Sequence, residues 1–242
     1  MRRNNYRLII LLLIAILLIF GIAITLFNNN NNNNTAISKP EVIANNTSDN
    51  GFVQVIKNIG NPNSSKKIAY VVGIHPLEND IHKTLLKLLP NTSNLNYSYD
   101  IYIVNVTEDF SSYGQLSPDD QPGRQTGQEL ALKYVYPEIS KGNYSLAVDI
   151  HGHGAYYPVE TFVFTPVDNQ LSSNYSHKVS NTTQNISYYD PQHTTSGPYL
   201  TVPLNEKGIP AFYYEENCYL TQDIKDLHML ELIHAIDNLK LQ

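Results

Sequence analysis

The sequence predicts one α/β domain, with a mostly parallel or mixed sheet and helices on both faces, preceded by a single transmembrane helix. Three observations lead to this prediction. From residue 67 onward, short apolar runs rich in β-branched residues alternate with stretches of helical period, and strands that alternate with helices imply a largely parallel sheet. An uncharged apolar stretch lies near the amino terminus. An asparagine-rich segment separates that stretch from the rest of the chain.

The transmembrane helix is predicted over residues 8–27, which carry no charge. About twenty apolar residues span a hydrocarbon core roughly 30 Å thick. Arg2, Arg3 and Arg7 precede the run and no Lys or Arg follows until Lys39, which places the amino terminus in the cytoplasm and the domain on the extracytoplasmic side. The alternative is a cleaved signal peptide, whose apolar core of about 7–15 residues ends at a small-residue cleavage site. This run is longer and lacks such a site, so we expect a single-pass protein of the cell membrane.

The chain therefore divides into four predicted segments. Residues 1–7 are a cytoplasmic stub, 8–27 the anchor, 28–50 a disordered tether and 51–242 the folded domain. The tether begins with a run of asparagines and shows no apolar period, a composition that cannot bury enough surface to fold.

Asn-x-Ser/Thr sequons support the extracytoplasmic placement. Composition alone predicts about four of them, whereas the chain has eleven. This excess predicts a glycosylated surface protein. The sequons lie at Asn33, Asn45, Asn46, Asn63, Asn91, Asn96, Asn105, Asn143, Asn174, Asn181 and Asn185.

Five segments of the domain have the length and the β-branched or aromatic composition of buried strands. In chain order they are 67–75, 100–107, 144–151, 161–167 and 209–214.

Four segments show the apolar spacing of a helix. In chain order they are 78–89, 124–140, 172–184 and 222–239. The spacing of the last predicts an inner face of Leu227, Leu230, Ile233 and Ile236.

Composition excludes several classes of function. The net charge is −6, with no basic block and no Trp, which argues against a nucleic-acid partner. Cys218 is the only cysteine, so no intrachain disulfide forms, and nothing around it would activate a catalytic thiol. No Gly-x-Ser-x-Gly motif is present to supply a serine nucleophile.

Three predicted strands end in residues that bind metals. The first runs into His75 and Glu78, the third ends at His151, and the fifth ends at Glu215 and Glu216. In open α/β sheets, sites form beyond the carboxyl ends of the strands. Two imidazoles and one carboxylate are a standard ligand set for catalytic zinc, with a fourth position left for water. We therefore predict that His75, Glu78 and His151 bind Zn²⁺.

A metal-activated water needs a nearby base. Glu215 is the predicted base, and the neighbouring Glu216 is the alternative. Arg124, the only arginine of the domain, begins a predicted helix. Its guanidinium is suited to bind a substrate carboxylate or to stabilise a developing oxyanion.

This order of residues resembles the zinc metallocarboxypeptidase superfamily, and within it the small succinylglutamate desuccinylase and aspartoacylase branch. The matching motifs are Gly-Ile-His75-Pro-Leu-Glu78, a later Arg, Asp149-Ile-His151 and Phe-Tyr-Tyr-Glu215, and they cover residues 66–240. The resemblance implies a carboxypeptidase-like fold, the same three zinc ligands and a glutamate base on a late strand. Two features depart from the family pattern. Gly123 precedes Arg124 where the family commonly has Asn, and the stretch between the ligand pair and the second His is short.

The remaining candidates have plain structural interpretations. His153 is expected in a solvent-facing loop, and His82 and His193 on the surface. Asp149 shares the strand face of His151, so it either orients that imidazole or is an ordinary edge carboxylate. Tyr199, in the loop before the fifth strand, is a candidate substrate contact.

The main hypothesis is a membrane-anchored, extracytoplasmic zinc hydrolase. Its substrate would be an amide bond of a small peptide or an N-acyl amino acid. The alternative is a catalytically inactive carboxypeptidase-like domain that serves surface binding or adhesion. The complete set of ligands plus a base argues against this alternative.

Overall fold

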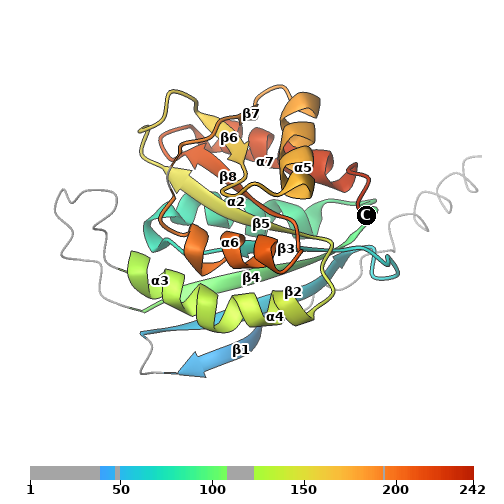
Figure 1. Ribbon diagram of the computed structural model, residues 1–242. Helices are drawn as coiled ribbons and strands as arrows, with labels where there is room; N and C mark the ends of the chain where they lie inside the picture. The colour runs from blue at the N-terminus through green and yellow to red at the C-terminus, as the bar shows by residue number, and fades with distance from the viewer. Residues whose placement is uncertain (1–38, 47–49, 108–122, 193) are drawn as a thin grey trace, which may run out of the picture. The chain divides into compact units, whose positions relative to one another are not determined.

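The computed structural model describes residues 39–46, 50–107, 123–192 and 194–242. Within Ser38–Gln242 the chain forms one compact unit around an eight-stranded mixed sheet of order β1-β2-β4-β3-β5-β8-β6-β7 (Figure 1). The strands are β1 (Glu41–Asn46), β2 (Gly51–Gly60), β3 (Lys67–Val72), β4 (Ser98–Val106), β5 (Leu146–His153), β6 (Thr161–Phe164), β7 (Ser187–Tyr188) and β8 (Ala211–Asn217).

The helices connect these strands. They are α2 (Asn79–Leu88), α3 (Arg124–Leu130), α4 (Tyr136–Lys141), α5 (Gln170–Thr182), α6 (Thr201–Glu206) and α7 (Gln222–Asp237). Short 3₁₀ turns cover Pro76–Glu78, Leu89–Asn91 and Gly197–Tyr199, and a π-helical turn, Ala131–Val135, joins α3 to α4. The predicted single helix over 124–140 is therefore continuous, with a wider turn in its middle.

The centre of the sheet is parallel. β4, β3, β5 and β8 run side by side in one direction, so their carboxyl ends meet at one edge. β2 and β6 flank them and run antiparallel to β4 and β8. The predicted mixed α/β architecture is thereby confirmed.

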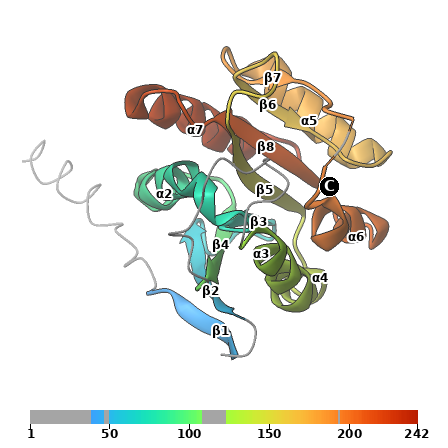
Figure 2. The same cartoon turned by 90° about the vertical axis from the view of Figure 1, so that its left-hand side faces the viewer.

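Helices cover both faces of the sheet, as predicted. In Figure 2, α2 and α7 lie on one side of the strands, and α3, α4 and α6 on the other. The first side packs Ile81, Leu85 and Ile233 against alternate strand residues such as Tyr70 and Val148. The second packs residues that include Leu130, Ile139 and Leu204 against Val71 and Ala147. We call these the α2/α7 face and the α3/α6 face.

The prediction for the start of the domain was wrong. The tether was expected to run to residue 50, but residues 41–46 form β1, paired with β2. β2 alternates buried Val53 and Val55 with half-buried Gln54, a period-2 pattern that places one side of the strand in the core. The two strands extend the sheet beyond β4.

The inner face of α7 was also predicted wrongly in part. Ile233 and Ile236 are buried, but Leu227 is 51% exposed. The inner face instead uses Met229 and Leu232. The periodic pattern of the helix is compatible with both rotations, and packing against α2 and α5 selects this one.

Among the described residues, no helix combines the length and the apolar composition that crossing a membrane requires. The predicted span, 8–27, lies outside the described residues.

Candidate metal centre

The first two predicted ligands come from the turn that follows β3. Gly73 has φ 88°, and a Cβ there would lie 2.1 Å from the carbonyl oxygen of Val104. A glycine is therefore needed for the chain to leave the sheet at this point. The 3₁₀ turn Pro76–Glu78 then brings both side chains to one side, and His75 Nδ1 lies 2.9 Å from Glu78 Oε1.

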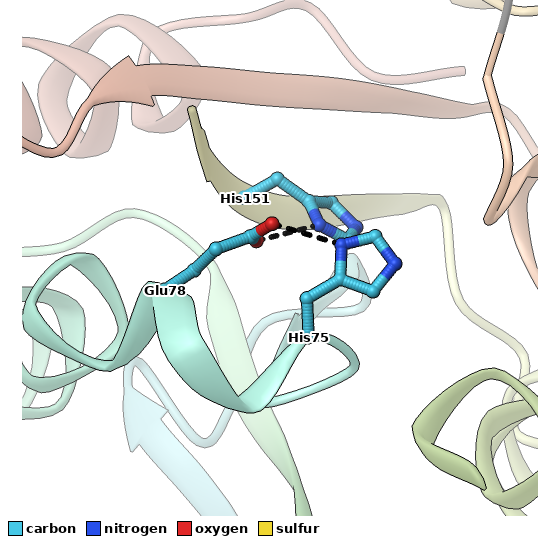
Figure 3. Close-up of side chains that lie close together, drawn as sticks. All are labelled: His75, Glu78 and His151. Atoms are coloured by element: carbon cyan, nitrogen blue, oxygen red, sulfur yellow. Dashed lines mark hydrogen bonds and ion pairs between the residues drawn. The ribbon is translucent and has the colours of Figure 1, made fainter. Parts of the chain in front are cut away.

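The third predicted ligand comes from β5. His151 Nδ1 lies 2.9 Å from Glu78 Oε2, so the carboxylate of Glu78 sits between the two imidazoles (Figure 3). One ligand atom from each of the three residues lies within 4.8 Å of the others. All three side chains are buried. The structure thus brings together the three residues that the sequence predicted as ligands.

This donor set fits a zinc ion. Both imidazoles present Nδ1 to the centre of the cluster, and a carboxylate completes a His₂Glu set, which is typical of catalytic zinc. Tetrahedral bonds of about 2.0–2.1 Å place ligand atoms a little over 3 Å apart, close to the 2.9 Å separations observed.

The outer nitrogen of each imidazole also has a neighbour. His151 Nε2 lies 3.0 Å from Asp149 Oδ1, and His75 Nε2 lies 3.1 Å from Gln128 Nε2. A metal-binding histidine usually donates its outer N–H to an acceptor, which holds the ring and its tautomer in place. With a metal on His75 Nδ1, Gln128 would therefore turn its amide oxygen, not its nitrogen, toward His75 Nε2. Asp149 therefore lies next to the ring, as one of its two predicted roles requires, but at an angle that forms no hydrogen bond with His151 Nε2.

The surrounding charges set the protonation of the cluster. Burial alone would raise the pKa of Glu78, but His75 and His151 hold it well below its usual value. Burial lowers the pKa of His75 to about 3, against the opposing effect of Glu78. His151 differs: burial disfavours its charged form, yet Asp149 and Glu78 together raise its pKa well above the usual value. At pH 7, Glu78 is thus ionised and His75 neutral, whereas His151 carries a proton in the absence of a metal. Because a metal ligand must be deprotonated, binding of an ion here would release the proton of His151.

Glu215 lies beside this cluster. In the parallel pairing of β5 with β8, His151 is opposite Glu215, so both side chains project from the α3/α6 face. Burial raises the pKa of Glu215 to about 8; His151 and Arg124 oppose this shift, while Glu78 and Asp149 add to it. A carboxyl group with a pKa near neutral is well suited to exchange protons with a substrate.

Glu216, the alternative base, points to the opposite face. It is fully buried, and its Oε1 lies 3.0 Å from Nδ1 of His228 on α7. Of the two adjacent glutamates, Glu215 alone shares a face with the ligands.

Arg124 reaches the site from the start of α3. Its Nη1 lies 3.7 Å from Glu78 Oε1, and its Nη2 donates to Thr195 Oγ1 at 2.7 Å. This approach depends on Gly127, where a Cβ would lie 2.0 Å from the carbonyl oxygen of Ile74. Any larger residue would push α3, and Arg124 with it, away from the turn of the ligands.

Tyr199 takes a more distant position. The 3₁₀ turn Gly197–Tyr199 precedes α6, and the Tyr199 hydroxyl accepts a hydrogen bond from Gln125 Nε2 at 3.0 Å. Gln125 is the neighbour of Arg124, so Tyr199 belongs to the rim of the site. Its hydroxyl bonds to Gln125 and not to any of the three ligands.

Two residues of the site were missed by the sequence analysis. Gln128, at the partner position of His75, lies four residues after Arg124, and this helical spacing was available as a signal. Thr195, which accepts from Arg124, lies in a loop and has no sequence signal of its own. Thr195 lies shortly before Tyr199, the predicted substrate contact, in the connection that leads to α6.

Two predictions about histidines were wrong. His153 was expected in a solvent-facing loop, but β5 continues to it and it is 5% exposed, with Nε2 3.0 Å from the carbonyl oxygen of Glu160. His82 was expected on the surface, but it is 5% exposed and its Nε2 lies 3.2 Å from the carbonyl oxygen of Ile150. His193 lies outside the described residues.

Comparison with known proteins relates this arrangement to a fold. No protein-family model and no curated protein match the sequence. Among solved structures, the tripeptide-bound cell shape determinant Csd4 from Helicobacter pylori matches with a TM-score of 0.54 at 12% identity, over 77% of this chain and 55% of that chain. The mDAP-bound form of the same protein, described as a D,L-carboxypeptidase, matches with a TM-score of 0.53 at 13% identity, over 76% of this chain and 54% of that chain.

A metallo-carboxypeptidase from Pseudomonas aeruginosa matches with a TM-score of 0.51 at 15% identity, over 84% of this chain and 65% of that chain. The chain thus spans a little over half the length of the Helicobacter protein. These likenesses show that the domain has a metallocarboxypeptidase-like fold, which confirms the fold that the sequence motifs implied.

Proposed function

We propose that this chain is a membrane-anchored, extracytoplasmic, zinc-dependent hydrolase that cleaves an amide bond of a peptide or an N-acyl amino acid. The observation that carries the proposal is the buried His75–Glu78–His151 cluster, with ligand atoms 2.9 Å apart and Glu215 on the same face of the sheet. A protein that had lost its catalytic activity would be expected to have lost one of these residues.

Each residue has a proposed task in the reaction. Zinc, when bound by His75, Glu78 and His151, lowers the pKa of a water molecule and polarises a carbonyl group. Glu215 accepts a proton from the attacking water on a carboxylate oxygen and donates it to the leaving nitrogen. Arg124 donates hydrogen bonds to the carbonyl oxygen as negative charge develops there. Asp149 and Gln128 hold the two imidazoles in orientation.

The substrate class is supported by the fold neighbours. The Helicobacter protein is described in complex with a tripeptide and as a D,L-carboxypeptidase, which favours a short peptide as the substrate here.

The location is supported by the sequence and by the exposure of sequons. Residues 8–27 form the predicted anchor, with Arg2, Arg3 and Arg7 before it and no Lys or Arg after it until Lys39. Asn63, Asn143, Asn174 and Asn181 are exposed in the structure and so are accessible to a glycosylating enzyme. Asn105 is different, since it lies within β4 and donates to Gln54 Oε1 at 3.3 Å.

Metal content is the first test. The full-length chain, purified in detergent and dialysed against trace zinc, should contain about one zinc per molecule. His75→Ala and His151→Ala should each abolish binding, whereas His234→Ala, at an exposed position of α7, should retain it. A metal-free parent protein would refute the proposal.

A further inference from the structure

The site contains one guanidinium, that of Arg124, and a hydrolase can use such a group in either of two roles. An amide hydrolase must stabilise the negative charge that develops on the carbonyl oxygen. An enzyme that removes the last residue of a peptide must in addition bind the free carboxylate of that residue. A desolvated carboxylate without a cationic partner costs several kcal/mol. The number and position of cations around the site therefore bear on the substrate.

Arg124 is placed for the carbonyl oxygen. Its Nη1 is 3.7 Å from Glu78 Oε1, an atom of a metal ligand. Its Nε and Nη2 both donate to Thr195 Oγ1, at 3.2 and 2.7 Å. Thr195 thus holds the guanidinium against the ligand cluster, where the scissile carbonyl must sit. A terminal carboxylate would lie beyond the scissile nitrogen, further from Glu78.

Among the described residues, cations are scarce in the stretches that follow the strands of the site. Lys225 is the only Lys or Arg in the residues after β3, β5 and β8 (73–79, 154–160 and 218–225) and in the loop that contains Thr195 (194–203). Lys225 is 4% exposed, and its Nζ donates to the carbonyl oxygen of Cys218 at 2.7 Å. Lys225 therefore stabilises the turn after β8.

We propose that this enzyme cleaves amide bonds whose amine side carries no free carboxylate, that is, internal peptide bonds or side-chain amides within a longer chain. This inference rests on the proposed hydrolase function and narrows its substrate class. Water adds across the C–N bond: its oxygen joins the carbonyl carbon, and its proton passes through Glu215 to the departing nitrogen. The enzyme is endo-acting, although its fold neighbours are described as carboxypeptidases.

Two peptide libraries test this directly. Both contain N-acetylated hexapeptides of mixed sequence, one ending in a free carboxylate and the other in a carboxamide. The zinc-loaded full chain should cleave internal bonds in both, with rates that differ by about threefold or less, since one ionic contact at an exposed end is worth under 1 kcal/mol. Release of the last residue from the free-acid library alone, at least about 100-fold faster than any other cleavage, would overturn the inference.

The kinetics of Arg124→Gln give a second criterion. If Arg124 stabilises the developing oxyanion, kcat falls about 100-fold or more for both libraries while KM stays constant. If it binds a terminal carboxylate, KM rises for the free-acid library only, which contradicts the inference. Lys207→Gln, at an exposed position in the turn before β8, is the matched charge control and should leave both parameters unchanged.

A binding measurement separates failure of this inference from failure of the proposed function. Glu215→Gln, which should not turn over substrate, is dialysed to equilibrium against each library, and the retained peptides are measured by mass spectrometry. Equal retention of the two libraries supports the inference, and selective retention of the free acid overturns it. A zinc-loaded parent that cleaves neither library refutes the hydrolase proposal, while the dialysis still decides the question of the carboxylate.

Discussion

Glu215 and Glu216 are adjacent on β8, yet they serve different regions of the molecule. Glu215 projects from the α3/α6 face, opposite His151 in the strand pairing and close to the ligand cluster. Glu216 projects from the α2/α7 face, where His228 Nδ1 lies 3.0 Å from its Oε1 and Thr161 Oγ1 lies 3.0 Å from the same nitrogen. One carboxylate faces the candidate ligand cluster, and the other faces a closed contact between a strand and a helix.

Burial raises the pKa of both groups, so burial alone does not distinguish them. The partners do. Glu216 has a dedicated imidazole, and this pair joins the end of β8 to α7. Among the described residues, Glu215 has no such hydrogen-bond partner, and several charges of the site influence its pKa. Glu215 is half-buried, and a carboxyl group without a dedicated partner is available for proton transfer, whereas a paired one is structural.

The largest difference is expected in turnover. Glu215→Gln removes the proton acceptor and should lower kcat by about 10²–10⁴-fold, with the zinc content unchanged. Glu216→Gln keeps the shape of its side chain on the opposite face and should change kcat by no more than a few fold. Steady-state kinetics with an amide substrate, together with elemental analysis, provide the measurement. Equal losses in the two variants would show that the faces are not independent.

The choice between these glutamates shows where the sequence stops being informative. Both follow aromatic residues at the end of a strand, and the period-2 rule only says that they point to opposite sides. Which of the two glutamates shares a face with the candidate metal ligands depends on the register of β8 against β5, which aligns Glu215 with His151. Register is a property of two strands far apart in the chain, so local pattern could not supply it.

The ligands themselves were predictable from local pattern. His75, Glu78 and His151 follow or end apolar strands, and the parallel order of those strands brings their ends together. His82 was mispredicted because a histidine on an amphipathic helix is normally assigned to the polar side. Its contact with the Ile150 carbonyl comes from β5, which is distant in sequence. β1 was missed because its asparagine-rich surroundings resemble a disordered tether.

The second prediction concerns stability on the α2/α7 face. His228→Ala leaves the buried Glu216 without its partner and should lower the free energy of unfolding by about 3 kcal/mol. Chemical denaturation measures the change. The double variant that adds Glu216→Gln should recover part of the loss, because the buried charge is then gone. A fully additive double variant would contradict the assignment of the pair.

The third prediction compares histidines rather than carboxylates. His151 lies between two carboxylates, which raise its pKa, whereas burial of His82 on α2 lowers its pKa to about 4. Because the unfolded value is about 6.5, the unfolded chain binds more protons between these limits. The stabilisation that His82 provides is therefore complete above about pH 6.5 and declines as the pH falls to 4, by up to about 3 kcal/mol.

Thermal or denaturant unfolding at a series of pH values tests this. His82→Gln removes the titrating group and retains a donor for the Ile150 carbonyl. As the pH falls over the same range, the free energy of unfolding of this variant should therefore decrease by about 3 kcal/mol less than that of the parent protein. All other titrating groups are common to both proteins. Parallel pH profiles would show that His82 is not the group responsible.

The smallest effect is expected at the partner of His151. Asp149 is buried and its Oδ1 lies 3.0 Å from His151 Nε2, so Asp149→Asn weakens the restraint on the ring without removing a ligand. Zinc affinity should fall by about 10–100-fold, as measured by competition with a chromogenic chelator. Asp226→Asn controls for the change in charge. The Asp226 side chain lies away from the site, and its Oδ2 pairs with Lys87 Nζ at a distance of 2.6 Å. Unchanged zinc affinity in Asp149→Asn would mean that β5 alone fixes the imidazole of His151. Asp149 on the α3/α6 face would then be a structural carboxylate, as Glu216 is on the α2/α7 face.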